Sequence, residues 1–319
     1  MFAVAGNKTK GKIIVRTMNV GMCNQLFTYA YARYLAEKNQ MELWLDYSHI
    51  TKADMKHNAG FDDALGNFSL EYTGIITKEE EYLQLTGEKG EKFEKILAPK
   101  WVRRRARGRY YEWLEKTKGK KLRKKGIHFN LIVDNESVKN EDIAEKENIL
   151  FGYWQIPQFA RKIKDILRNE IVGKYQLSEQ LNAWKTVFEK DNAVCVHIRR
   201  GDYVGDQMHE VCTDSYYEKA MELYRNKMEN PIFYVFSDDK NYVRELYRNT
   251  EDVVVVENIE NDYEELILMS SFSSYIISNS SFSWWAQFLG DAKNVIAPNR
   301  WYGDENKKSL LYEEHWEKI

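Results

Sequence analysis

The residues best suited to chemistry follow a short apolar run at positions 194–198. That run, which includes His197, leads directly into Arg199 and Arg200 and, after one glycine, into Asp202. A run of this kind predicts a buried strand, which cannot hold unpaired guanidinium groups in its interior. The strand should therefore end near His197, with the charges at its carboxyl end, the edge where open α/β sheets bind ligands. Because the arginine fork suits phosphate oxygens, the pair predicts a phosphorylated or nucleotide ligand; the alternative is a surface Arg–Asp turn.

Polar residues also follow the strand predicted at residues 231–236. Ser237, Asp238 and Asp239 stand there, directly before a predicted helix. A serine or aspartate before a helix is an ordinary N-cap, whereas two neighbouring acids can also hold a metal ion. Both alternatives stay open at this point.

A third polar cluster opens another predicted helix. Residues 278–283 read Ser-Asn-Ser-Ser-Phe-Ser. Small hydroxyl residues there leave backbone N–H groups and the positive end of the helix dipole where a phosphate can dock. We therefore predict a phosphate site, with a plain helix cap as the alternative. The acids among residues 262–265 are either solvated or offer a carboxylate to the N1–H and amine of guanine.

Strand and helix patterns alternate along the chain and would position these clusters. Residues 13–18, 26–38 and 42–46 predict strand, helix and strand, which implies a parallel sheet. The stretch 51–147 has several helical signals and few strand signals, so it predicts insertions, and a helix is expected after residue 157. The further predicted strands are residues 193–197, 231–236, 253–256, 275–277 and 294–297, and the further helices are residues 216–227, 241–247 and 283–289. At 319 residues the chain can form two domains, 1–155 and 156–319.

Composition argues against several classes of protein. No apolar run approaches the roughly 18 residues of a membrane span, and the first residues lack the apolar stretch of a secretory signal. Three cysteines without a CxxC pattern argue against a disulfide framework or a thiolate zinc site. We expect a cytoplasmic protein.

The net charge of −2 hides a strongly basic segment at residues 100–125. The segment holds thirteen Lys and Arg against two acids, with Trp101, Tyr110, Tyr111 and Trp113 among them. Such a surface suits anionic lipid headgroups, an anionic glycan or nucleic acid. The alternative is a solvated pair of helices with buried aromatic side chains.

Residues 197–203, His-Ile-Arg-Arg-Gly-Asp-Tyr, resemble the HxRRxD motif of the GDP-fucose-dependent fucosyltransferases. The resemblance is strongest to the bacterial α-1,2-fucosyltransferases of glycosyltransferase family 11. Four further blocks agree with that family in order and spacing: residues 21–27, 152–155, 236–239 and 268–285.

The resemblance implies an α/β fold of two Rossmann-like domains facing a cleft, the GT-B type. Residues 1–155 would be the acceptor-side domain with a helical insertion, and residues 156–319 the GDP-fucose-binding domain. It further implies inverting transfer of L-fucose from GDP-β-L-fucose to the 2-hydroxyl of a terminal β-galactoside, in surface polysaccharide or O-antigen synthesis. No metal, other cofactor or nucleic acid is expected.

The resemblance also implies roles for individual residues. Arg199 would bind the β-phosphate and offset the charge on the leaving GDP. The other implied donor contacts are Asn24, Gln25, His197, Arg200, Ser237, Asp238, Glu265, Asn279, Ser280, Ser281 and Phe282. Glu265 would bind guanine. Cys23 stands where the family usually has glycine, which would strain a backbone of positive φ.

The catalytic base is expected in the loop after the arginines. Asp202 is the first choice because it shares a loop with Arg199, although it could serve only as the salt-bridge partner of the arginines. Asp206 and His209 are the alternates.

Two other functions remain open. One is a GDP-fucose-dependent enzyme that makes another linkage. The other is a non-catalytic protein that binds polyanions or a membrane surface through residues 100–125. In the enzyme, the same segment would hold the protein peripherally on the inner face of an anionic membrane.

Overall fold

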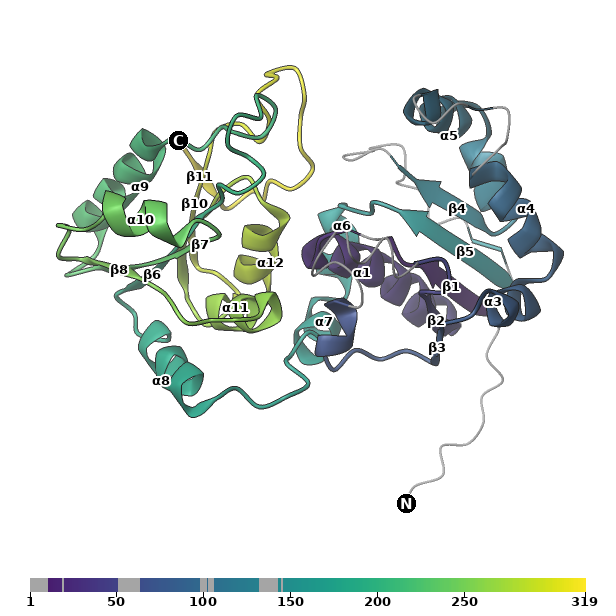
Figure 1. Cartoon of the computed structure of the whole chain (residues 1–319), viewed down its shortest axis with the longest axis horizontal. Helices are drawn as coiled ribbons and strands as arrows, with labels where there is room; N and C mark the ends of the chain where they lie inside the picture. The colour runs from purple at the N-terminus through teal and green to yellow at the C-terminus, as the bar shows by residue number, and fades with distance from the viewer. Residues whose placement is uncertain are drawn as a thin grey trace. The chain divides into compact units, whose positions relative to one another are not determined.

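In a computed structural model of the chain, residues 11–18, 20–50, 64–97, 102, 106–131, 143–144 and 146–319 are described. The chain divides into two compact units, residues 1–66 with 70–170, and residues 67–69 with 171–319 (Figure 1). Each unit is a parallel sheet flanked by helices, as the alternation of strands and helices predicts.

The first unit contains a sheet of five parallel strands among its described residues, in the order β3-β2-β1-β5-β4. Its strands are β1 (Lys12–Arg16), β2 (Glu42–Asp46), β3 (Gly74–Ile76), β4 (Ile127–Asn130) and β5 (Glu147–Gly152). The sequence predicts β1 and β2 but misses the other three. Polar side chains hide β4 and β5, because His128 and Asn148 are buried in them and bind each other at 2.9 Å.

The helices of the first unit cover both faces of its sheet. They are α1 (Met22–Asn39), α3 (Glu79–Thr86), α4 (Glu88–Leu97), α5 (Arg107–Arg123), α6 (Pro157–Lys162) and α7 (Lys164–Glu170). One core joins side chains of α3, α4 and α5 to the sheet. Helix α1 packs against α6, where Tyr31 stacks on Trp154 with ring centroids 4.2 Å apart and contacts Phe159. Because α6 and α7 pack with α1, the boundary falls after Glu170, later than the expected residue 155.

Helix α1 begins at Met22, four residues earlier than predicted. Cys23, Asn24 and Gln25 therefore lie in its first turn and not in a glycine turn. Cys23 is absent from the described residues with positive φ, so the strain expected at this position does not arise.

The second unit contains a sheet of six parallel strands among its described residues, in the order β11-β10-β9-β6-β7-β8. These are β6 (Ala193–Ile198), β7 (Ile232–Ser237), β8 (Val253–Val255), β9 (Ser274–Ile276), β10 (Asn294–Ala297) and β11 (Glu317–Lys318). The helices are α8 (Glu179–Phe188), α9 (Asp214–Lys227), α10 (Lys240–Leu246), α11 (Asp262–Met269) and α12 (Ser281–Gly290). The sequence predicts β6 to β10 to within two residues at each end and misses β11 and α8.

The two faces of this sheet carry different cores. Val194, Val196 and Ile198 pack with α9 and α10, while His197 points to the opposite face and contacts α12. Figure 1 shows α9 and α10 on one side of the sheet and α11 and α12 on the other. This alternation follows from the two-residue period of a strand.

One short segment from the first half of the chain belongs to the second unit. Phe68 is buried, forms an isolated antiparallel bridge with Gly173, and lies with its ring 6.4 Å from that of Tyr263 in α11.

None of the helices in the described part of the chain has the length and hydrophobicity that a membrane span requires.

Candidate functional site

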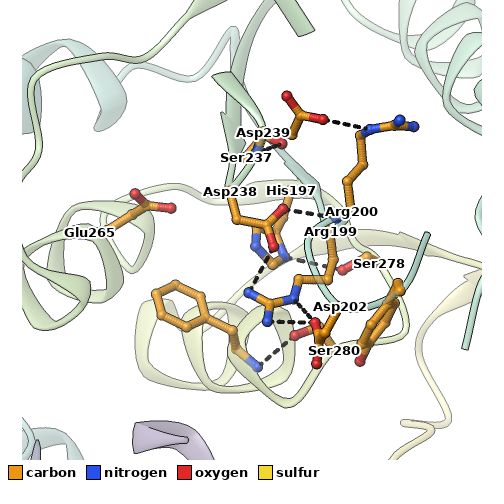
Figure 2. Close-up of polar contacts among 12 residues, drawn as sticks. His197, Arg199, Arg200, Asp202, Ser237, Asp238, Asp239, Glu265, Ser278 and Ser280 are labelled. Carbon is orange, nitrogen blue, oxygen red and sulfur yellow. Dashed lines mark hydrogen bonds and ion pairs between the residues drawn. The ribbon is translucent and has the colours of Figure 1, made fainter. Parts of the chain in front are cut away.

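The charged residues singled out by the sequence meet at the carboxyl edge of the second sheet. Strands β6 and β7 pair in parallel, with His197 opposite Phe236 and Ile198 opposite Ser237, so they end in step. Arg199 and Arg200 follow one strand and Asp238 and Asp239 the other. Figure 2 shows the resulting cross-strand ion pairs.

Arg199 is held between two carboxylates. Its Nη1 lies 3.0 Å from Asp238 Oδ2, and its Nε and Nη2 donate to Asp202 Oδ1 at 3.1 and 2.7 Å. Burial by itself would lower the pKa of Arg199, but Asp238 and Asp202 raise it overall, so the group stays a cation. One third of the side chain remains exposed, which leaves a fixed positive charge facing the edge of the sheet.

Arg200 points away from Arg199 (Figure 2). Its Nε donates to Asp239 Oδ2 at 3.2 Å, and its guanidinium lies over the Tyr242 ring, 3.3 Å from the centroid. Its backbone N–H donates to Asp238 Oδ1 at 2.8 Å. Arg200 thus holds the loop against α10 in this geometry, and its contact with the donor stays a prediction.

The two aspartates bind arginines and backbone. Asp239 caps α10 by accepting from the Tyr242 N–H at 3.1 Å, and this bond together with Arg200 lowers the pKa of Asp239. Ser237, buried at the end of β7, accepts from the Asp239 N–H at 3.1 Å. Of the two alternatives for this cluster, the geometry favours the helix cap. No group of three or more His, Cys, Asp or Glu side chains among the described residues is placed to hold a metal ion.

His197 lies beneath the start of α12. Its Nδ1 is 2.6 Å from Ser283 Oγ and 3.1 Å from Ser278 Oγ, and its ring stacks on Phe282 at 5.5 Å. Burial, then the charges of Arg199 and Lys240, lower the pKa of His197 to about 3. A neutral imidazole therefore joins β6 to the helix start. The sequence places Ser278 and Ser283 in a phosphate-binding run but misses this contact.

The first turn of α12 faces the carboxyl edge of the second sheet, where the arginines lie. Ser280 is the N-cap, and its hydroxyl accepts from the Phe282 N–H at 3.2 Å. Ser281 and Phe282 are half-buried in the turn that follows. The ten residues of α12 give this turn the positive end of a helix dipole, which suits a phosphate.

The side chain of Asn279 binds the loop that follows the arginines. It is buried, donates to the backbone oxygens of His209 and Trp301 at 2.9 Å each, and accepts from Cys212 Sγ at 3.5 Å. Both amide hydrogens are therefore in use. Asn279 thus anchors the loop 199–212, and the donor contact expected of it stays a prediction.

That loop carries the residues predicted as the catalytic base. Asp206 Oδ2 lies 2.6 Å from His209 Nδ1, while the Met208 N–H donates to Asp206 Oδ1 at 2.9 Å. These hydrogen bonds lower the pKa of Asp206, so it orients the imidazole as a carboxylate. The Tyr203 ring lies 5.7 Å from the Arg199 guanidinium carbon and 5.2 Å from the His209 ring.

Glu265 lies in the first turns of α11, with 18% of its side chain exposed. Burial raises the pKa of Glu265, and Lys240 opposes that shift with its Nζ 3.7 Å from Oε2. Lys240, the first residue of α10, is a member of this neighbourhood that the sequence analysis missed. A lysine directly after two acids resembles an ordinary solvated helix start.

Asn24 and Gln25 lie in the first unit. Asn24 Oδ1 accepts a hydrogen bond from Gln155 Nε2, which joins two of the sequence blocks that carried the resemblance. Gln25 is buried and donates to Val20 O at 2.9 Å.

Comparison with known proteins gives a family match over most of the chain. A model described as Glycosyl transferase family 11 matches residues 13–319. The alpha-1,2-colitosyltransferase of Escherichia coli is 34% identical over 169 residues, 50% of this chain and 58% of that protein. The O-antigen biosynthesis glycosyltransferase WbnK of Escherichia coli is 32% identical over 177 residues, 50% of this chain and 57% of that protein. The chain thus matches little more than half the length of these curated relatives.

Solved structures give the fold. The fucosyltransferase NodZ from Bradyrhizobium superposes with a TM-score of 0.53 at 14% identity, covering 90% of this chain and 95% of that one. A structure titled NodZ alpha-1,6-fucosyltransferase soaked with GDP-fucose gives a TM-score of 0.50 at 14% identity, with 90% and 94% covered. The α/β fold of GT-B type implied by the resemblance is confirmed.

The buried neutral His197 predicts a pH dependence of stability. Its folded pKa of about 3 lies below the ordinary value of 6.5, so unfolding takes up a proton between these values. The free energy of unfolding should fall as the pH drops below 6.5, by about 1.4 kcal/mol per pH unit from this group. His197→Gln should flatten that dependence in denaturant titrations between about pH 6.5 and pH 4.5. His209→Gln, at a half-exposed position, is the control; equal slopes for wild type and His197→Gln would contradict the prediction.

Proposed function

Because the chain belongs to glycosyltransferase family 11, we propose that it is an inverting α-1,2-fucosyltransferase acting on a terminal β-galactoside. The donor is GDP-β-L-fucose, and the product belongs to a surface polysaccharide or O-antigen. The observation that carries the proposal is Arg199, a cation fixed by Asp202 and Asp238 at the edge where α12 begins.

The chemistry follows from charge. When the bond between C1 of the sugar and the β-phosphate oxygen breaks, the electron pair stays on that oxygen. Arg199 and the first turn of α12 stabilise the growing negative charge, since both are oriented before the reaction begins. The acceptor oxygen bonds to C1 from the opposite face, which inverts the configuration. In this proposal the transfer needs no metal ion.

The base that takes the proton from the acceptor hydroxyl comes from the loop 199–212. His209 is favoured over Asp202, because Asp206 holds His209 Nδ1 and leaves Nε2 for the acceptor. Asp202 Oδ1 already accepts two hydrogen bonds from Arg199, so Asp202 acts mainly as its positioning partner.

Two alternative functions differ from this proposal, one in the sugar transferred and the other in the linkage formed. The name of the colitosyltransferase favours transfer of colitose as a second candidate, and the α-1,6 linkage in the NodZ title keeps another linkage as an alternative. The name of the colitosyltransferase also supports the α-1,2 linkage proposed here.

A nucleotide panel tests the proposed donor. GDP should raise the melting temperature of the protein far more than UDP or ADP, because a ligand that binds the folded state stabilises it. With GDP-fucose and lactose, linkage analysis should find fucose on the 2-hydroxyl of galactose. No shift with GDP would count against the donor, and any other linkage would move the protein to the alternatives above. Salt-sensitive polyanion binding without a GDP effect would support a non-catalytic protein.

Arg199 variants provide the matched control for that panel. Arg199→Lys keeps the charge and loses the fork, so we expect the fold to remain while transfer falls about 100-fold to 1000-fold. Arg199→Ala should be at least as inactive. Near-normal turnover by Arg199→Lys would overturn the phosphate role.

The assignment of the base predicts unequal losses. His209→Gln should lower kcat by about 100-fold to 10,000-fold with little change in KM for GDP-fucose. Asp202→Asn should act through Arg199 and therefore raise KM for the donor more than it lowers kcat. Steady-state kinetics on lactose measure both, and the reverse pattern would return the role of base to Asp202.

We further propose that α5 rests on an anionic membrane at the cytoplasmic face. Arg109, Trp113, Lys116 and Lys120 are exposed and stand at the spacing of one helix face. Trp113 is 47% exposed, which suits a bilayer interface.

Within the described part of the basic segment, one ion pair is internal and two aromatic residues are partly covered. Glu115 and Arg123 are buried against each other, so they add nothing to the charge of the surface. Tyr110 and Tyr111 are half-buried and donate to the backbone of α4, in line with the alternative of covered aromatic residues. Residues 100, 101 and 103–105 lie outside the described residues. Among the described residues of α5, Glu112 is the one exposed acid beside the exposed cations.

Charge removal tests this contact. Changing Arg109, Lys116 and Lys120 together to Gln should weaken binding to vesicles with anionic lipid by about 3 kcal/mol, at about 1 kcal/mol per charge. Turnover of soluble lactose should stay unchanged, because the site in the second unit is untouched. Co-sedimentation and kinetics measure the two effects.

The control variant changes Lys185, Lys190 and Lys293 of the second unit to Gln and should keep vesicle binding near the wild-type level. Loss of lactose turnover with intact vesicle binding in the α5 variant would instead place α5 at the acceptor site.

A further inference from the structure

The ammonium group of Lys240 is buried without a hydrogen bond. Its Nζ is shielded from solvent and finds no hydrogen-bond partner among the described residues. An ammonium carries three donors, and leaving it shielded and unbonded is unfavourable. The first turn of a helix adds to the cost, because the helix dipole is positive there. Such a group is explained if it meets an acceptor in another state of the protein.

Glu265 is the closest described charge. Its Oε2 lies 3.7 Å from Lys240 Nζ, beyond hydrogen-bond distance, and most of its side chain is buried. Two shielded groups of opposite charge thus stand side by side, one able to donate and the other able to accept. Their direct contact is too long to satisfy either.

The pair borders the arginine cluster. The charge of Lys240 contributes to the low pKa of His197, and the charge of Asp238 contributes to the raised pKa of Glu265. Figure 2 shows Glu265 set apart from the group formed by Arg199, Asp202 and Asp238. Lys240 and Glu265 thus lie within electrostatic reach of the residues that follow β6 and β7.

We infer that Lys240 donates to O6 of guanine, next to Glu265, for which the resemblance implies acceptance from N1–H and the exocyclic amine. Guanine places an acceptor next to donors along this edge, which matches an ammonium next to a carboxylate. Adenine carries an amine in place of O6 and no hydrogen on N1, so it opposes both groups. The inference rests on the proposed GDP-sugar donor and adds Lys240 as a residue that determines specificity for its base.

Titration calorimetry of the full chain with three nucleotides tests the pair. GDP has both features, IDP lacks the exocyclic amine, and 6-thio-GDP replaces O6 with a poorer acceptor. Lys240→Met should bind GDP about 10-fold to 100-fold more weakly than wild type, as expected for loss of a charged hydrogen bond. It should also lose the preference for GDP over 6-thio-GDP while keeping the preference for GDP over IDP.

Glu265→Gln should show the reciprocal pattern, losing the preference for GDP over IDP and keeping that over 6-thio-GDP. Lys185→Met, a matched change on α8, should behave as wild type. If Lys240→Met does not fold, Lys240→Gln, which can still donate to O6, should retain part of the preference for GDP over 6-thio-GDP.

Two results would overturn the inference. Unchanged preference for GDP over 6-thio-GDP in a folded Lys240→Met or Lys240→Gln would make Lys240 a structural residue and leave the proposed function standing. Absence of GDP binding by the wild-type protein would remove the proposed function and this inference together.

Discussion

The parallel pairing of β6 with β7 is the constraint on which the site depends. Because the strands end in step, the residues that follow them must share one edge, and the arginines after β6 meet the aspartates after β7. Asp238 binds both the Arg199 side chain and the Arg200 backbone, so one carboxylate fixes the loop and the cation. A slip of one residue in the register would move His197 to the other face of the sheet and set the arginines out of step with the aspartates.

Beneath that edge, the second unit uses neutral polar contacts where a charge would be unfavourable. His197 joins β6 to α12 through two serine hydroxyls, and Asn279 joins the start of α12 to the loop 199–212. Burial keeps the imidazole neutral, which suits a position below a cluster of cations. The partly exposed charge of Arg199 can then face a ligand, while the neutral groups His197 and Asn279 keep β6, α12 and the loop in place.

The sequence predicts β6 to β10 and the edge where the charges of the second unit lie, because these strands are apolar runs of three to six residues bounded by polar residues. It misses β11, a charged pair of residues, Glu317 and Lys318. It does not predict how side chains turn after a strand ends. Arg199 and Arg200 are therefore indistinguishable in sequence, although one faces the open edge and the other binds α10. The backbone partners of Asn279 are likewise absent from the sequence prediction, since they cannot be read from a pattern. The basic segment shows a further limit, because composition does not reveal that Glu115 and Arg123 are buried as an ion pair while other charges of the segment are exposed.

Residues 67–69 give the second unit a feature that bears on its modularity. Phe68 supplies the bridge to Gly173 and a ring contact to Tyr263, on the helix that also carries Glu265. A fragment starting at residue 171 would keep every strand of the second sheet and still lack this contribution. The second unit therefore cannot be exchanged as one continuous segment of the chain. Exchanging the first half of the chain between relatives would also exchange residues 67–69, which pack on α11, the helix assigned to the nucleotide base.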